Sequence, residues 1–151
     1  MDDIVITAAT NDERVWTAET MSNSQPWINL GITIEQCQKT CNDPEYLIFI
    51  AHLENIPCGA IVMQQHGVAG SPYVKSIVVS KEFKGKGVGK SLMKFVEEYF
   101  RAYSKHMFLC VSSFNKDAQS FFKALGYVQV GEFKDYIIAG ESEILMYKKL
   151  K

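Results

Sequence analysis

Residues 76–92, SIVVSKEFKGKGVGKSL, decide the fold, because a strand pattern, a glycine-rich turn and a helix pattern follow one another there. The turn carries three glycines and three lysines, namely Gly85, Gly87, Gly89, Lys84, Lys86 and Lys90. Glycine allows backbone angles that other residues avoid, and it lets the main chain approach a ligand closely. The unpaired N–H groups at the start of the following helix favour an anion. This stretch therefore predicts a site for a ligand that carries a pyrophosphate.

Strand and helix patterns flank this stretch on both sides. Strand patterns occupy residues 4–7, 46–53, 58–64, 73–80, 107–112, 127–133 and 143–150. Helix patterns occupy residues 11–21, 32–41, 90–103 and 115–125, with Thr33 and Asn115 as N-caps and Gly126 as a stop signal. Because strands first pair as a hairpin and then alternate with helices, we expect one α/β domain over residues 1–151. Its sheet should be mixed, mostly antiparallel and flanked by helices.

The helix expected at residues 90–103 has the clearest periodicity in the chain. Its apolar face is formed by Leu92, Val96, Tyr99, Phe100 and Tyr103. Glu97 and Arg101 lie four residues apart and away from that face. Lys94 and Glu98 have the same spacing, which favours ion pairs on the solvated face of a helix, so surface pairs are expected at both places.

The composition of the 151 residues is that of an ordinary globular protein, with 47% hydrophobic residues, 22% charged residues and a net charge of −1. This balance favours neither nucleic acid nor an anionic membrane as a partner. No apolar run reaches the ~20 residues of a membrane span, and the opening Met-Asp-Asp lacks the positive charge of a signal peptide. The four cysteines have neither zinc-site nor disulfide-framework spacing. We therefore expect reduced cysteines, no metal and a cytoplasmic location.

The sequence patterns of two well-known phosphate-binding loops each differ from this turn by one residue. The P-loop pattern GxxxxGK[ST] matches Gly89, Lys90 and Ser91, but its first glycine falls on Lys84. The dinucleotide fingerprint GxGxxG needs a glycine at Lys90 or at Leu92, depending on its start. A P-loop nucleotide-binding protein stays open at this point as the weaker alternative.

A third pattern fits the turn. Residues 77–89, IVVSKEFKGKGVG, resemble the acyl-CoA-binding motif of the GNAT N-acetyltransferase superfamily, in which a strand precedes a turn of type R/Q-x-x-G-x-G/A. Lys84 stands where that family usually has Arg or Gln. The resemblance implies acetyl-CoA as the acyl donor, with the pantetheine arm bound by the backbone of Ile77, Val78 and Val79. The pyrophosphate would be held by Lys84, Gly85, Lys86, Gly87, Val88, Gly89 and Lys90.

A second segment supports the same resemblance. Residues 111–127, VSSFNKDAQSFFKALGY, are similar to the family's other motif, a strand followed by N-x-x-A-x-x-F-Y-x-x-x-G-F. The residues that match in register are Asn115, Ala118, Phe121, Leu125, Gly126 and Tyr127. The resemblance places Asn115 and Phe122 beside the cofactor, and Asn115 can also cap its helix.

The resemblance implies acetyl transfer to a primary amine by direct attack, which needs a general base and a proton donor. The family's frequent acid is the tyrosine after the Phe121 position, and here that residue is Phe122, which has no proton to give. Ser112 is then the candidate proton donor. Glu141 and Glu143 are candidate bases by charge alone, and Glu143 is the one we select. With no clear acid or base, a non-catalytic acyl-CoA-binding module is the main alternative.

The acceptor is less well defined by the sequence. In the family the segment between the first two helices lines the acceptor cleft, which points to residues 21–31 and to Trp27 as an apolar wall. Residues 128–144, with Tyr136 at their edge, would form the other wall. The acceptor is a small-molecule or peptide amine of unspecified class. Family members often form dimers, so a homodimer is left open.

Overall fold

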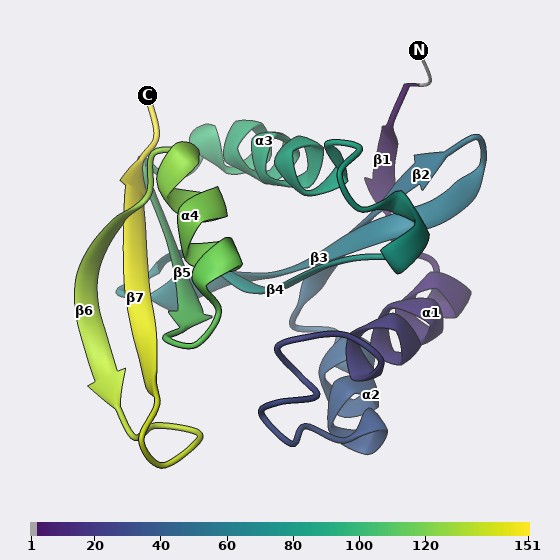
Figure 1. Cartoon of the computed structure of the whole chain (residues 1–151). Coiled ribbons are helices and arrows are strands. Elements are labelled where there is room, and N and C mark those ends of the chain that lie inside the picture. The colour runs from purple at the N-terminus through teal and green to yellow at the C-terminus, as the bar shows by residue number, and fades with distance from the viewer. Residues whose placement is uncertain (1–2) are drawn as a thin grey trace.

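The computed structural model describes residues 3–151 and contains one seven-stranded sheet, in the order β1-β2-β3-β4-β5-β7-β6 (Figure 1). Its strands are β1 (Val5–Ala8), β2 (Leu47–Leu53), β3 (Ile56–Val68), β4 (Ser71–Val79), β5 (His106–Ser112), β6 (Val128–Lys134) and β7 (Ser142–Lys149). Neighbouring strands are antiparallel except β4 and β5, which are parallel. The expected mixed, mostly antiparallel α/β sheet is therefore confirmed.

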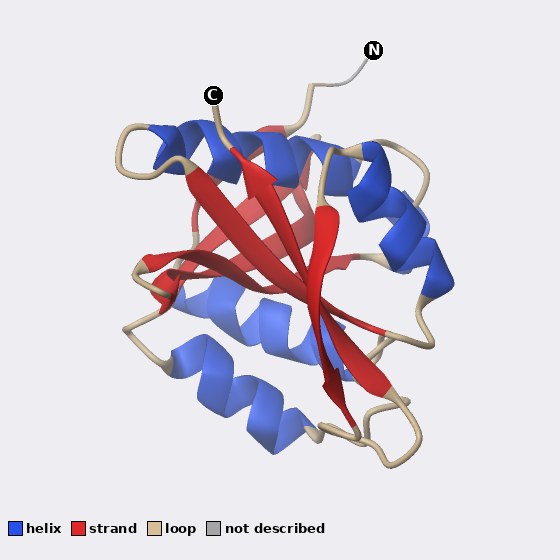
Figure 2. Cartoon of the chain, turned by 90° about the vertical axis from the view of Figure 1, so that its left-hand side faces the viewer, coloured by secondary structure: helices blue, strands red, loops and turns tan. Residues whose placement is uncertain are grey.

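Four helices cover the two faces of this sheet. They are α1 (Asn11–Ser22), α2 (Ile34–Asn42), α3 (Val88–Arg101) and α4 (Lys116–Ala124), and a 3-10 turn, η1 (Lys81–Phe83), precedes α3. Helices α3 and α4 lie on one side of the sheet and α1 and α2 on the other (Figures 1 and 2). Each side has its own buried core, because each face of the sheet is packed against helices.

The helix ends follow the capping signals of the sequence. Thr10 and Thr33 form capping boxes with Glu13 and Gln36, in which each threonine hydroxyl accepts from a backbone N–H of the first turn. The Asn115 side chain accepts from the Ala118 N–H, so the expected N-cap of α4 is confirmed.

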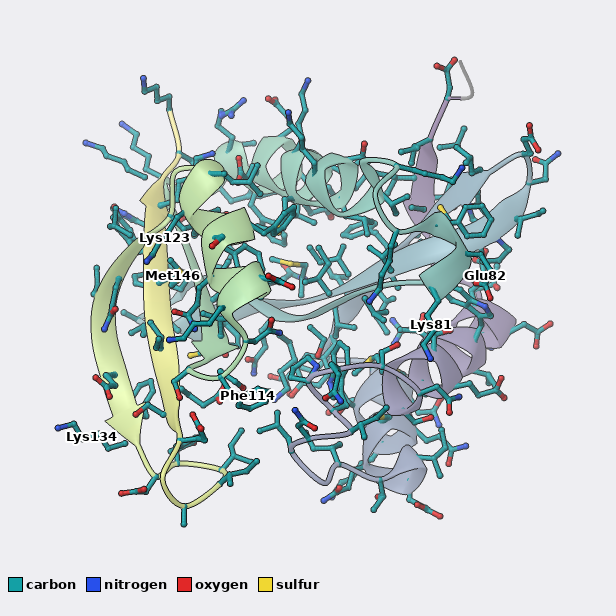
Figure 3. The ribbon with its side chains drawn as sticks, viewed as in Figure 1. Lys81, Glu82, Phe114, Lys123, Lys134 and Met146 are labelled. Atoms are coloured by element: carbon teal, nitrogen blue, oxygen red, sulfur yellow. The ribbon has the colours of Figure 1, made fainter. Side chains whose placement is uncertain are left out.

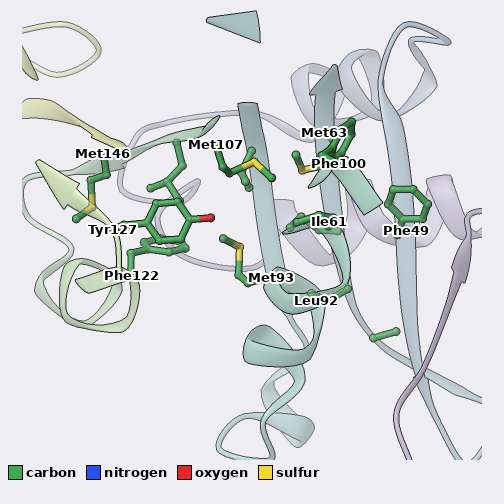
Figure 4. Packing of buried hydrophobic residues seen from close by; sticks show 14 of the residues in the cluster. Phe49, Ile61, Met63, Leu92, Met93, Phe100, Met107, Phe122, Tyr127 and Met146 are labelled. Carbon is green, nitrogen blue, oxygen red and sulfur yellow. The ribbon is translucent and has the colours of Figure 1, made fainter. Parts of the chain in front are cut away.

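The core under α3 extends from the middle of the sheet to β7. Leu92 and Met93 of α3 pack there with Ile61, Met107 and other apolar side chains, and the Tyr127 ring lies beside Phe122 toward the end where Met146 is found (Figure 4). Gly59 lets α3 lie close to β3, because a Cβ at that position would stand 2.7 Å from a methyl carbon of Val88. This contact fixes the start of α3 relative to the sheet.

The expected surface pair of Glu97 and Arg101 is wrong. Glu97 is buried, accepts from the Tyr127 hydroxyl at 2.9 Å and pairs with Lys148 Nζ at 2.9 Å. Arg101 pairs with Glu98 instead, at 2.6 Å. Tyr103, expected on the apolar face, lies beyond the end of α3 and is 77% exposed. The helical pattern does not include Lys148, whose positive charge offsets the desolvation cost of burying the Glu97 carboxylate.

The sheet opens between β4 and β5. Only Tyr73 and Val74 of β4 pair with β5, opposite Phe108 and Leu109. Just after them, Lys75 is skipped in the register between β3 and β4, which is the signature of a β-bulge. From there to Val79, β4 is paired with β3 but not with β5. The two parallel strands therefore diverge toward the glycine loop (Figure 1).

Candidate active site

A cleft of about 1070 Å³ occupies the opening between β4 and β5. Its lining comes from both strands, from the loop before α3, from α4, from the segment that joins α1 to α2, and from the end of β6 with the loop after it. Lys81 and Glu82 of η1 mark the start of the loop before α3 in Figure 3. Segments that are far apart in the sequence thus meet around one cavity.

The glycine loop adopts a backbone that side chains would strain. Gly85 and Gly87 have φ values of 79° and 81°, in the left-handed region. Gly87 is the N-cap of α3, and no side chain caps that helix. The first N–H groups of α3 are therefore available to a ligand, and the helix dipole favours an anion there.

Most residues expected at the cofactor site line this cleft. They are Ile77, Val78, Val79, Lys84, Gly85, Gly87, Val88, Gly89, Lys90, Asn115 and Phe122. Lys86 belongs to the same loop but is exposed and lies outside the lining. Within this turn, then, Lys84 and Lys90 are the lysines that face the cavity.

Helix α4 approaches the loop closely at Gly89. A Cβ at Gly89 would stand 3.3 Å from Phe121 Cζ, so the absence of a side chain lets the Phe121 ring lie close to the loop. Phe122 is 5% exposed, and its ring packs against Phe121 and Tyr127 at centroid distances of 5.1 and 6.0 Å. Phe122 contributes an apolar surface to the cleft.

The two residues selected as proton donor and base lie side by side. Ser112 and Glu143 are opposite each other in the register of β5 and β7, and Ser112 Oγ donates to Glu143 Oε2 at 2.6 Å. Burial raises the pKa of Glu143, and the hydrogen bond from Ser112 opposes part of that rise. Glu141 accepts from the Ser113 hydroxyl and does not line the cleft.

Two further polar side chains in this region escaped the sequence reasoning. Tyr73 and Cys110 line the cleft next to each other. Burial raises the pKa of both groups, and the nearby Glu143 carboxylate adds to each rise. One signal was present: Cys110 lies two residues from Ser112 on a strand, hence on the same face. The pairing that brings Tyr73 there has no local signal.

The two expected acceptor-wall residues also line the cleft. Trp27 is 7% exposed and belongs to the core that α1 and α2 form with the sheet. Tyr136 is 69% exposed, and its ring lies 5.5 Å from that of Phe133. One wall is thus fixed in the core and the other is open to solvent.

Within residues 3–151, no cluster of three or more His, Cys, Asp or Glu side chains has the arrangement of a metal site. No helix in that range is both long and apolar enough to span a membrane.

Comparisons with known proteins agree with this geometry. Along the chain, 34% of 82 residues are identical to an uncharacterised N-acetyltransferase of Methanocaldococcus jannaschii, and the match spans 53% of each chain, about half the length of that relative. A protein assigned to the GNAT family from Desulfovibrio desulfuricans superposes with a TM-score of 0.82, at 13% identity, over 99% of this chain and 100% of the other. A protein assigned as a streptothricin acetyltransferase from Bacillus anthracis, in complex with acetyl coenzyme A, superposes with a TM-score of 0.66 at 25% identity. The match covers 75% of this chain and 67% of the other. Residues 8–127 match the family described as Acetyltransferase (GNAT) family, and because they make up more than half of the chain, the protein belongs to that family.

Proposed function

We propose that this protein transfers the acetyl group of acetyl-CoA to the primary amine of a small molecule or peptide. The main support is one arrangement: the glycine loop and the hydrogen-bonded pair of Ser112 and Glu143 line the same cleft between β4 and β5. The family assignment supports it, as does the acetyl coenzyme A bound in the Bacillus anthracis structure. The P-loop alternative is superseded, because the family match includes that loop.

The residues of the cleft fit acetyl-CoA. The left-handed turn at Gly85 and Gly87 presents backbone N–H groups to a pyrophosphate, and Lys84 and Lys90 add positive charge. The edge of β4 that faces away from β3 is free of strand partners beyond Val74, so it can pair with the amide groups of a pantetheine arm. A volume of about 1070 Å³ leaves room for part of the donor together with an acceptor.

When bound, acetyl-CoA supplies a thioester whose C–S bond breaks as the amine nitrogen forms the amide, so one amine proton ends on the thiol and one goes to solvent. We assign to Glu143 the removal of a proton from the incoming ammonium. Its raised pKa makes it a stronger base than an exposed glutamate. Ser112, hydrogen-bonded to Glu143, can pass a proton to the departing sulfur and recover it from the carboxyl group.

The loop and the strands contribute by positioning. Burial of the Ser112 hydroxyl and the 2.6 Å bond hold the pair in one geometry before substrate arrives. Phe122 and Phe121 line the same cleft with apolar surface, which keeps water away from the reacting groups. A backbone N–H of β4 near Val79 would stabilise the developing oxyanion.

The test is a thermal-shift titration with acetyl-CoA and, in parallel, with magnesium-ATP. A ligand at a hundred times its Kd stabilises by about 2.7 kcal/mol. For a chain of this length that raises the midpoint by about 5–10 °C. We expect this shift with acetyl-CoA alone, followed by amine-dependent thiol release. A shift with magnesium-ATP alone would refute the proposal, and binding of acetyl-CoA without thiol release on any amine would favour a non-catalytic module.

A further inference from the structure

We propose that the acceptor is a small amine with a single positive charge on an apolar, aromatic body, an inference that rests on the proposed function. It comes from the half of the cleft that faces α1 and α2, which we call the acceptor half. On β5, Leu109 and Val111 point into the core under α3. Because side chains alternate along a strand, Cys110 and Ser112 face the opposite way, toward α1 and α2. The Glu143 side chain is on that face too, since it accepts a hydrogen bond from the Ser112 hydroxyl.

A single carboxylate serves this half. Among the described residues that line the cleft, only Asp117 and Glu143 are acidic, and Asp117 belongs to the first turn of α4. Oxygen Oε2 of Glu143 is engaged by Ser112, and no described residue donates a hydrogen bond to Oε1. This leaves one acceptor atom for one ammonium group.

Positive charge near the pair discourages a second cation. Lys75 lines the cleft at the bulge of β4, and its charge acts on the neighbouring Cys110 thiol. Lys84 and Lys90, the other lining lysines, are assigned to the pyrophosphate of the donor, which leaves Lys75 as the lining cation beside the Ser112–Glu143 pair. Additional ammonium groups of a polyamine or an aminoglycoside would be desolvated there without a partner.

Both walls of the acceptor half are apolar. Pro26, Trp27 and Leu30 line one side. Phe133, Tyr136 and Ile137 line the other, and all three are exposed large apolar side chains. Solvent-exposed apolar groups gathered at the mouth of a cavity mark a binding surface. An aromatic body between these walls would stack on Tyr136 and Phe133, with its ammonium directed to Glu143.

The experiment measures kcat/KM at fixed acetyl-CoA for phenethylamine, butylamine, spermidine and kanamycin. We expect phenethylamine to exceed both polycations by at least about tenfold, and butylamine to lie below phenethylamine, because an aromatic ring buries more apolar surface. Equal or greater kcat/KM for a polycation would overturn this inference and leave acetyl transfer standing. Absence of turnover on all four amines, with acetyl-CoA bound, would overturn this inference, and absence of thiol release on peptide amines as well would overturn the proposed function.

Matched tyrosine variants locate the effect. Tyr136→Ala should raise KM for phenethylamine by about tenfold and KM for butylamine by less, with KM for acetyl-CoA unchanged. Tyr103→Ala removes a tyrosine that is also exposed but lies outside the cleft lining, and it should change none of these constants. Equal KM values for phenethylamine in the two variants would overturn the assignment of the aromatic wall.

Discussion

Ser112 on β5 donates a 2.6 Å hydrogen bond to Glu143 on β7, and the two residues are direct partners in the register of these strands. A carboxylate that is part-buried and bonded to a hydroxyl is held in place without being neutralised by a cation. The pair lies in the cleft that also contains the glycine loop. The pair proposed for proton transfer and the loop proposed to hold the cofactor therefore share one cavity.

Replacement of Glu143 tests the base. In Glu143→Gln the side chain keeps an oxygen that accepts from Ser112 but cannot take a proton, so kcat should fall by about 10²-fold or more. For the wild type, kcat at saturating amine should decrease toward acid with a midpoint above the usual glutamate range, because burial raises the pKa of Glu143. This acidic limb should be absent in the variant.

The change in folding stability caused by Glu143→Gln can be predicted from the direction of the Glu143 pKa shift. A raised pKa means that the folded chain binds the proton more tightly than the unfolded chain. The stability that this group contributes is present at low pH and is lost as pH rises through the raised pKa. At neutral pH Glu143→Gln should therefore melt no lower than the wild type. Glu132→Gln, on the exposed side of β6, is the control and should keep its activity.

The glycine loop is tested by a pair of glycine variants. Gly87 and Gly70 have φ values of 81° and 80°, and a Cβ at either position would meet nothing within 4 Å. Alanine in the left-handed region costs about 1–2 kcal/mol, so both variants should lose similar stability. Only Gly87→Ala should weaken acetyl-CoA binding, by about tenfold in a calorimetric Kd, since Gly70 lies outside the cleft lining. Equal affinities in the two variants would show that this loop does not hold the cofactor.

Replacing the lysines of the loop should have effects that depend on whether each lysine lines the cleft. Lys84 and Lys90 line the cleft, whereas Lys86 does not. Lys84→Ala and Lys90→Ala should each weaken acetyl-CoA binding and reduce its dependence on salt, because ionic strength screens contacts between lysine and phosphate. Lys86→Ala should change both quantities less. A larger effect at Lys86 would place the pyrophosphate on the outer side of the turn.

Phe122 tests whether a proton donor is missing. If Ser112 supplies the proton, Phe122→Tyr should raise kcat by far less than the ~10²-fold that a new general acid provides. The ring is buried against Phe121 and Tyr127, so the melting temperature of the variant must be measured alongside. A gain near 10²-fold would show that proton delivery limits the wild-type rate and would contradict the role assigned to Ser112.

Local patterns predicted the elements well, because caps, turns and periodicity act over a few residues. Thr33 and Asn115 cap their helices as expected, and the glycine turn joins β4 to α3. Glu97 shows where local patterns fail: its burial depends on Tyr127 and on Lys148, which is 51 residues away. No helical period contains that information.

The residues proposed to hold the cofactor were also visible in the sequence, since they are consecutive in the loop and in the second motif. Ser112 and Glu143 were also proposed from the sequence, but the contact between them was not. Ser112 and Glu143 are 31 residues apart, and only the pairing of β5 with β7 around the intervening α4 and β6 makes them neighbours. Tyr73 reaches the same region through the short parallel pairing with β5, which spacing along the chain does not reveal.

Acetyl transfer is measured most directly by the mass of phenethylamine after incubation with the protein and acetyl-CoA carrying a deuterium-labelled acetyl group. We predict an N-acetylated product that carries the label, formed at least ~10²-fold more slowly by Glu143→Gln than by the wild type and at the wild-type rate by Glu132→Gln. Unmodified amine and intact thioester, in a sample where acetyl-CoA is demonstrably bound, would contradict the account and identify the chain as an acyl-CoA-binding protein without transferase activity toward this amine.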